Sequence, residues 1–145
     1  MKMIETMLFE RPGNQNTSHC IEMVVKQVKE HGRKHVVVAS TSGKTAMAFY
    51  KALAGAGANL VVVTHSVGFK EPGLDEFDPQ VRKQLRKAKV PIHTGTILTH
   101  SLEKSLMDNF RGIYPGYLIA NTLRCFGEGT KVALEIVMEA CDAGL

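Results

Sequence analysis

Cysteine is scarce in this chain of 145 residues, and long apolar runs are missing. Cys20, Cys125 and Cys141 form no C-x-x-C pair, and an odd number of cysteines argues against a disulfide framework. We therefore expect reduced thiols and a cytoplasmic protein. The segment before Arg11 lacks the apolar core of a signal peptide, and no apolar run approaches the roughly 20 residues of a membrane span. We expect no membrane partner.

A strong charge of one sign is also missing. The 18 basic and 14 acidic residues give a net charge of +4, which does not indicate a nucleic-acid partner. The densest basic run, Arg82 to Lys89, lies on the outward face of a predicted helix whose inward face carries Val81, Leu85 and Ala88. No aromatic residues for base stacking interleave with it. We expect a solvated helix face and no nucleic-acid binding.

Common cofactor and metal signatures are absent as well. No cluster of histidines and carboxylates stands out in the sequence, so we expect no metal site. Gly55-Ala-Gly57 follows a predicted helix instead of opening one, which excludes a dinucleotide-binding fingerprint. Ser42-Gly-Lys-Thr45 lacks the first glycine of a triphosphate-binding loop, because Val38 occupies that position.

What is present is an alternation of apolar strands and amphipathic helices. The expected strands are Val36–Ala39, Leu60–Thr64 and Val90–Thr96. The first expected helix carries the apolar positions Ile21–Val28 and ends at Gly32, and the second carries Ala46–Leu53 and stops at Gly55 or Gly57. Further helices are expected from Pro79 through Ala88 and over Ser101–Phe110, Tyr117–Phe126 and Gly129–Ala143. Such alternation predicts a mainly parallel sheet in a three-layer α/β/α sandwich, formed by residues 1–145 as one domain. The last helix is apolar on nearly all sides, so we expect it to be deeply buried.

The segment after the first strand is the most informative of the chain. The apolar run Val36–Ala39 passes into Ser40, Thr41, Ser42, Gly43, Lys44 and Thr45, and then into a helix. A strand–turn–helix of this kind directs free main-chain N–H groups and a helix dipole at one point, where an anion binds well. We interpret Ser40–Thr45 as a phosphate cradle. The alternative is an ordinary, well-capped turn.

A long loop, His65 to Pro79, follows the second strand. Because the carboxyl ends of parallel strands share one edge of the sheet, we place Thr64 and His65 beside the cradle. Phe69 and Phe77 either stack on a ligand ring or pin the loop to the core. The carboxylates of this loop are not fixed relative to His65 by anything in the sequence, so we assign no catalytic residue.

Asn121 and Arg124 lie three residues apart on one predicted helix and therefore share a face. Arginine suits the recognition of phosphate or carboxylate groups, so we add both residues to the site. The alternative for Arg124 is a salt bridge to a nearby Asp or Glu.

Several segments carry a resemblance when they are taken together: Phe9–Gly13 with Asn16-Thr17, Val37–Ala46, Val62–Gly73, Gly112–Pro115 and Ile119–Arg124. In combination they resemble a family of small prokaryotic proteins that look like the C-terminal α/β domain of pyruvate kinase standing alone. The resemblance implies a sugar-phosphate type of site at Ser40–Thr45 and FMN as a cofactor. It places the ribityl chain near Asn16, Thr17 and Thr64, and the ring near His65 or Phe69. Pyruvate kinase catalysis is not implied, because its catalytic barrel has no counterpart here.

That family usually continues with a glycine-rich segment and two closing strands, whereas this chain stops at Leu145. The resemblance therefore implies a three-stranded sheet with a bare edge, in a fragment or in a homo-oligomer whose second copy covers the edge. We expect a binding domain for a phosphorylated small molecule, FMN by preference. The alternatives are a flavin-dependent reductase, a small hydrolase using His65, and a ligand-free oligomerising or regulatory module.

Overall fold

The computed structural model describes residues 5–96 and 102–145. Its elements follow in the order η1 (Asn14–Asn16), α1 (Thr17–His31), β1 (His35–Ala39), α2 (Lys44–Ala52), β2 (Asn59–Val63), α3 (Pro79–Lys87), β3 (Ile92–His93), α4 (Leu102–Phe110), α5 (Pro115–Arg124) and α6 (Glu128–Asp142). The strands form a parallel sheet in the order β1-β2-β3. The predicted α/β class is confirmed.

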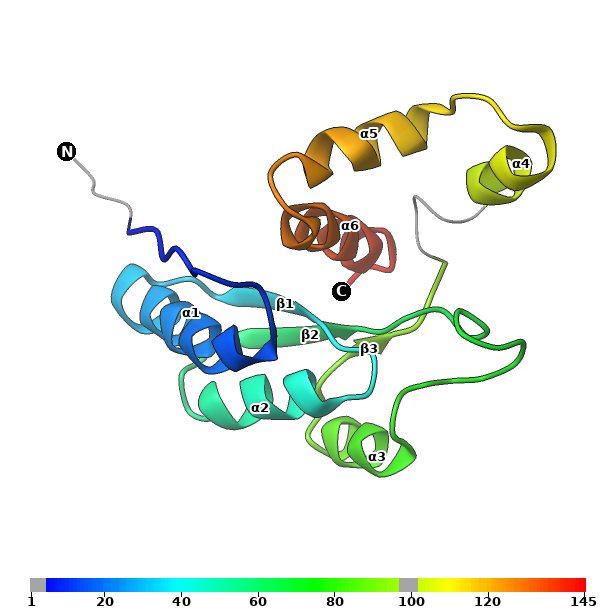
Figure 1. Cartoon of the computed structure of the whole chain (residues 1–145). Coiled ribbons are helices and arrows are strands. Elements are labelled where there is room, and N and C mark those ends of the chain that lie inside the picture. Colours follow the sequence, from blue (N-terminus) through cyan, green and yellow to red (C-terminus); the bar gives the residue numbers. More distant parts are fainter. Residues whose placement is uncertain (1–4, 97–101) are drawn as a thin grey trace.

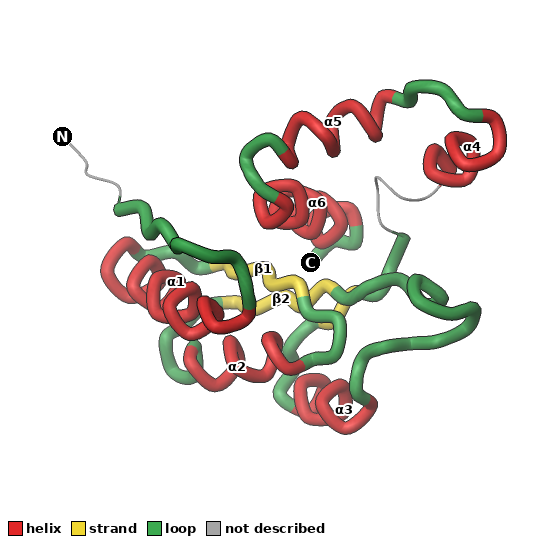
Figure 2. The backbone as a smooth tube through the Cα atoms, in the orientation of Figure 1, coloured by secondary structure: helices red, strands yellow, loops and turns green. Residues whose placement is uncertain are grey.

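The helices lie in two layers, one on each side of the sheet (Figures 1 and 2). On one side α1 and α2 pack together, and α2 also contacts α3. On the other side α6 crosses β1 and β2, with α5 packed on α6 and α4 on α5. No helix within residues 5–96 and 102–145 is both long enough and apolar enough to cross a membrane.

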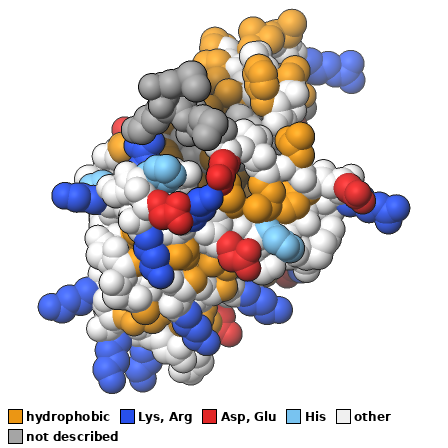
Figure 3. Space-filling view, turned by 90° about the vertical axis from the view of Figure 1, so that its left-hand side faces the viewer, with side chains coloured by type: hydrophobic (Ala, Val, Ile, Leu, Met, Phe, Trp, Pro, Cys, Tyr) orange, Lys and Arg blue, Asp and Glu red, His pale blue; other side chains and the backbone are white. Residues whose placement is uncertain are grey.

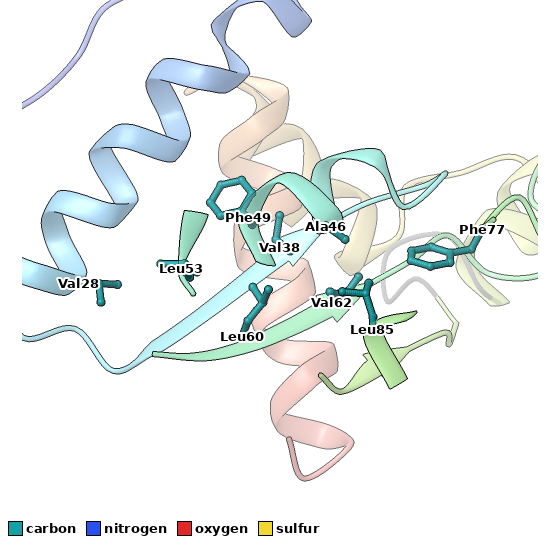
Figure 4. Close-up of a cluster of buried hydrophobic side chains, with 9 residues drawn as sticks. All are labelled: Val28, Val38, Ala46, Phe49, Leu53, Leu60, Val62, Phe77 and Leu85. Atoms are coloured by element: carbon teal, nitrogen blue, oxygen red, sulfur yellow. The ribbon is translucent and has the colours of Figure 1, made fainter. Parts of the chain in front are cut away.

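The main core lies between the sheet and the layer of α1, α2 and α3. Val38 of β1 and Val62 of β2 are in register and point into it. Figure 4 shows these side chains with Ala46 and Phe49 of α2 and with Leu85 of α3. The remaining buried members are Val28, Leu53, Leu60 and Phe77. Of the two loop aromatics, Phe77 is the one that pins the loop to the core, since it is almost completely buried.

A smaller apolar cluster lies on the opposite face of the sheet. Val61 and Val63 of β2 alternate with Leu60 and Val62 and pack with Ala140 of α6. Burial on both faces explains why β2 reads as a continuous apolar run in the sequence.

The third strand is shorter than the predicted Val90–Thr96. Only Ile92 and His93 form it, paired with Val62 and Val63. The preceding Pro91 has no N–H to donate, although its carbonyl accepts from the Val62 N–H at 3.0 Å. After His93 the two chains are joined by a side-chain hydrogen bond, between Thr64 Oγ1 and Thr94 Oγ1 at 2.8 Å.

The prediction of deep burial for the last helix is wrong. Leu134, Val137 and Met138 of α6 are exposed, and Met138 retains 55% of its accessible surface. The helix rests on the sheet through a single face, which includes Ile136 and Ala140. Apolar side chains are also exposed above it, where Figure 3 shows them gathered at the height of α4 and α5.

Candidate functional site

The turn between β1 and α2 is held by the side chain of Ser40. Its hydroxyl oxygen accepts hydrogen bonds from the main-chain N–H of Gly43 at 3.1 Å and of Ala46 at 3.2 Å. Its own N–H donates to the Val63 carbonyl at 2.9 Å, which fixes the turn to β2. Ser40 is buried. This hydroxyl therefore shapes the predicted cradle from inside, and two amides of the turn are already used.

Four further main-chain N–H groups remain open in the turn. Those of Thr41, Ser42, Lys44 and Thr45 meet no protein acceptor among the described residues. They lie at or just before the first turn of α2, where unsatisfied N–H groups and the helix dipole favour an anion. The Lys44 side chain is exposed beside them. The arrangement can hold a phosphate through main-chain donors.

His65 faces this turn from the end of β2. Its Nε2 lies 3.4 Å from Thr41 Oγ1, and its Nδ1 lies 3.3 Å from Glu76 Oε2. A carboxylate on Nδ1 favours the tautomer with a proton there, which leaves Nε2 as an acceptor for the Thr41 hydroxyl. The ring of Phe69 packs against His65 with centroids 4.2 Å apart and planes tilted by 42°. The carboxylate that the sequence could not assign to His65 is thus Glu76.

The turn, His65 and Phe69 line one cavity of about 410 Å³. Among the residues predicted for the site, those on its wall are Ser40, Thr41, Ser42, Thr45, Thr64, His65, Phe69 and Arg124. The turn of β1, the loop after β2 and helix α6 together form the wall, at the carboxyl ends of two parallel strands. That is the edge at which open α/β sheets usually bind ligands.

Five predicted site residues are not on this wall. Gly43 shapes the turn with φ of 91°, and Lys44 points outward beside it. Asn16 donates its side-chain N–H to the Arg11 carbonyl at 2.7 Å, and Thr17 begins α1. Asn121 accepts from Arg124 Nη1 at 3.2 Å, and so orients the arginine from behind.

Helix α6 supplies a charged wall that sequence reasoning missed. Its lining residues recur every three or four positions along one face: Glu128, Lys131, Val132, Glu135, Ile136 and Glu139. Arg124 Nε lies 2.7 Å from Glu128 Oε2, which is the salt bridge considered as the alternative for this arginine. The signal in the sequence was the repeat of charged residues on one face of an otherwise apolar helix.

Glu139 is the most perturbed group of this wall. Burial and, to a smaller extent, the neighbouring Glu135 carboxylate raise the pKa of its carboxyl to about 7, against the opposing effect of Lys131. Its Oε2 has no hydrogen-bond partner within the described part of the chain. From the sheet side, the imidazole Nε2 of His93 in β3 lies 3.9 Å from this oxygen.

Comparison with models of known protein families found no match for this chain. Within the ranges 5–96 and 102–145, no three His, Cys, Asp or Glu side chains are grouped so that they could hold a metal ion. The family resemblance and its cofactor therefore stay predictions from the sequence.

Proposed function

We propose that this chain binds a phosphorylated small molecule in the cavity between the β1–α2 turn and α6, with FMN as the preferred ligand. The observation that carries the proposal is the set of four open N–H groups in the turn: Thr41, Ser42 and Thr45 line that cavity, and Lys44 lies beside it at the start of α2. Main-chain donors at a helix start suit a phosphate dianion, because they add positive potential without side chains that must be ordered.

The remaining wall fits the other parts of FMN. A cavity of about 410 Å³ is within the usual range of small-molecule sites. The half-exposed ring of Phe69, packed on His65, offers an aromatic surface to a flat ring system. Thr64 and the charged face of α6 offer polar contacts to a hydroxylated chain. The exposed free thiols of Cys20, Cys125 and Cys141 suit a reducing compartment such as the cytoplasm.

Calorimetry tests the proposal directly. We expect FMN and inorganic phosphate to bind the purified protein, and FMN to give it a visible flavin spectrum. The double variant Lys44→Ala/Thr45→Ala removes a charge and a hydroxyl from the turn, and should weaken both ligands about tenfold or more. Lys51→Ala, in the last turn of α2, is the matched control and should bind normally. Absence of binding by FMN, ribose 5-phosphate and phosphate alike would refute the proposal.

A second candidate, a small hydrolase, is favoured by the chain Thr41–His65–Glu76. In this reaction His65 Nε2 takes the Thr41 Oγ1 proton as Oγ1 attacks an ester carbonyl, and the open Ser42 N–H stabilises the oxyanion. The alcohol leaves with the proton from His65, and a water molecule, deprotonated by His65, then releases the acid and regenerates Thr41. Glu76 holds the imidazole in place.

The hydrolase is tested with p-nitrophenyl acetate. Thr41→Val and His65→Gln should each lower the rate at least about 100-fold, a typical contribution of acid–base catalysis. Thr122→Val removes an exposed hydroxyl from α5 and should leave the rate unchanged. Rates that are equal in all four proteins exclude this candidate and leave the binding proposal untouched.

A further inference from the structure

The face of α6 that lines the cavity carries three buried ionisable side chains, Lys131, Glu135 and Glu139. Lys131 Nζ and Glu135 Oε2 form an ion pair within this face. Glu139 is 4% exposed, and its Oε2 has no hydrogen-bond partner in the described parts of the chain. Buried polar groups in folded proteins are almost always hydrogen-bonded, so this oxygen requires an explanation.

The groups that surround Glu139 do not satisfy it. On its own helix it faces the Glu135 carboxylate, which repels it, and Lys131, which attracts it but is paired with Glu135. On the sheet side, His93 Nε2 of β3 stands 3.9 Å away, beyond hydrogen-bond distance, and Val61 and Val63 of β2 are apolar. Glu139 Oε2 is therefore an acceptor without a hydrogen bond from the nearby protein groups, and Glu139 lines the cavity.

We propose that Glu139 accepts a hydrogen bond from an O–H or N–H group of the ligand whose phosphate binds at the β1–α2 turn. The site then selects phosphorylated molecules that carry such a donor over phosphate esters that carry none. This inference rests on the proposed function, and it assigns the second polar contact of the same ligand. A carboxylate forms strong, charge-assisted hydrogen bonds, so the contact contributes affinity as well as orientation.

The two contacts belong to one cavity, because Thr41, Ser42 and Thr45 of the turn and Glu139 of α6 all line it. Glu128 and Glu139 mark the ends of the α6 wall, eleven residues apart. The Lys131–Glu135 ion pair lies between them and neutralises the middle of the wall. A polyhydroxylated chain, with or without a ring, suits this wall better than a second anion, because Glu139 would repel a negative charge.

Three probes separate the two sources of the donor. Ribose 5-phosphate offers hydroxyl groups only, FMN offers hydroxyl groups and a ring N–H, and phenyl phosphate offers no donor outside its phosphate. Calorimetry compares the wild type with Glu139→Met, which replaces the carboxylate by an apolar side chain of similar length. Glu139→Gln keeps one acceptor oxygen without the charge. Glu22→Met, on an exposed position of α1, is the matched control.

We expect Glu139→Met to weaken ribose 5-phosphate and FMN about tenfold or more, as for loss of a charged hydrogen bond, while phenyl phosphate is unchanged. The affinities of Glu139→Gln for ribose 5-phosphate and FMN should lie between those of the wild type and of Glu139→Met. Glu22→Met should bind all three probes as the wild type does. A loss confined to FMN assigns the donor to its ring, and a loss for both assigns it to hydroxyl groups.

Equal affinities of wild type and Glu139→Met for all three probes would overturn the inference, as would an equal loss for all three. In both cases phosphate binding by the wild type would still support the proposed function. If the wild type binds neither these three probes nor inorganic phosphate, the proposed function fails, and this inference fails with it.

Discussion

Ser40 and Ala46 are joined by a hydrogen bond across six residues, in which Ser40 Oγ accepts from the Ala46 N–H at 3.2 Å. The same oxygen accepts from the Gly43 N–H, so one hydroxyl ties the end of β1 to the first turn of α2. The N–H groups of the same turn that stay open lie between and beside the two that this oxygen binds. The shape of the turn proposed to bind an anion thus depends on the Ser40 side chain.

Replacing Ser40 by Ala should therefore damage both stability and binding. Two N–H groups lose their acceptor in a buried turn, which should lower the free energy of unfolding by about 1–3 kcal/mol. Urea denaturation measures this loss, and phosphate calorimetry should show weaker binding. Ser105→Ala, on the exposed surface of α4, is the control and should change stability by less than about 0.5 kcal/mol. Similar denaturation midpoints for the two variants would contradict the capping role.

Gly43 should tolerate no side chain, because backbone conformation and space both oppose one. Its φ is +91°, and a Cβ there would stand 2.7 Å from Val81 Cγ1 and 3.1 Å from Phe77 Cζ. Gly55 has a similar φ of +73° but nothing within 4 Å of such a Cβ. Gly55→Ala should cost about 1 kcal/mol of unfolding free energy from strain alone, and Gly43→Ala clearly more. Thermal melting of both variants checks this, and equal losses would show that the close contacts are relieved.

The elements and edge that build the site follow from the sequence. Val36–Ala39 and Leu60–Val63 are uninterrupted apolar runs, as is typical of strands in a parallel sheet, and the structure places β1 and β2 there. Once two parallel strands are known, their carboxyl ends must share an edge. For this reason the turn after Ala39 and the loop after Thr64 could be placed side by side without coordinates.

What the sequence could not provide is tertiary orientation. The apolar residues of α6 fit several faces equally well, so the pattern could not tell that Glu135 and Glu139 turn toward the cavity while Met138 stays exposed. Likewise, four loop carboxylates were available to His65, and only the folded path of the loop selects Glu76. Arg82 was predicted to lie on a solvated face, yet it turns back to Asp75.

Glu139 should make stability depend on pH in an unusual direction. Its pKa is raised from 4.5 to about 7, so the folded state favours the protonated form. This stabilisation is fully present below pH 4.5 and is lost as the pH rises through 7. Glu139→Gln stays neutral at every pH. Its free energy of unfolding should therefore exceed that of the wild type by up to about 3 kcal/mol at pH 8 and equal it near pH 4.5. Chemical denaturation at both pH values measures this, with Glu22→Gln as control. If the difference in unfolding free energy between Glu139→Gln and the wild type is the same at both pH values, Glu139 is not the group that causes the pH dependence.

Arg82 fastens the loop that carries His65 and Glu76. Its Nη2 lies 2.7 Å from Asp75 Oδ2, and its Nη1 donates to Thr94 Oγ1 at 3.4 Å. Its guanidinium also covers the Phe77 ring at 4.8 Å from the centroid. These contacts link the loop to α3 and to the chain after β3, so they hold the end of the loop next to Glu76.

Arg82→Met should loosen this loop without unfolding the sheet. Losing the ion pair and the cation–π contact should make local opening about 1 kcal/mol easier, which raises tryptic cleavage after the exposed Lys70 about fivefold. Arg86→Met removes an exposed arginine from the same helix and should leave that cleavage rate unchanged. Peptide mapping identifies the cut. If both variants are cleaved at the wild-type rate, Arg82 does not restrain the loop, and the alignment of His65 with Glu76 depends on other contacts.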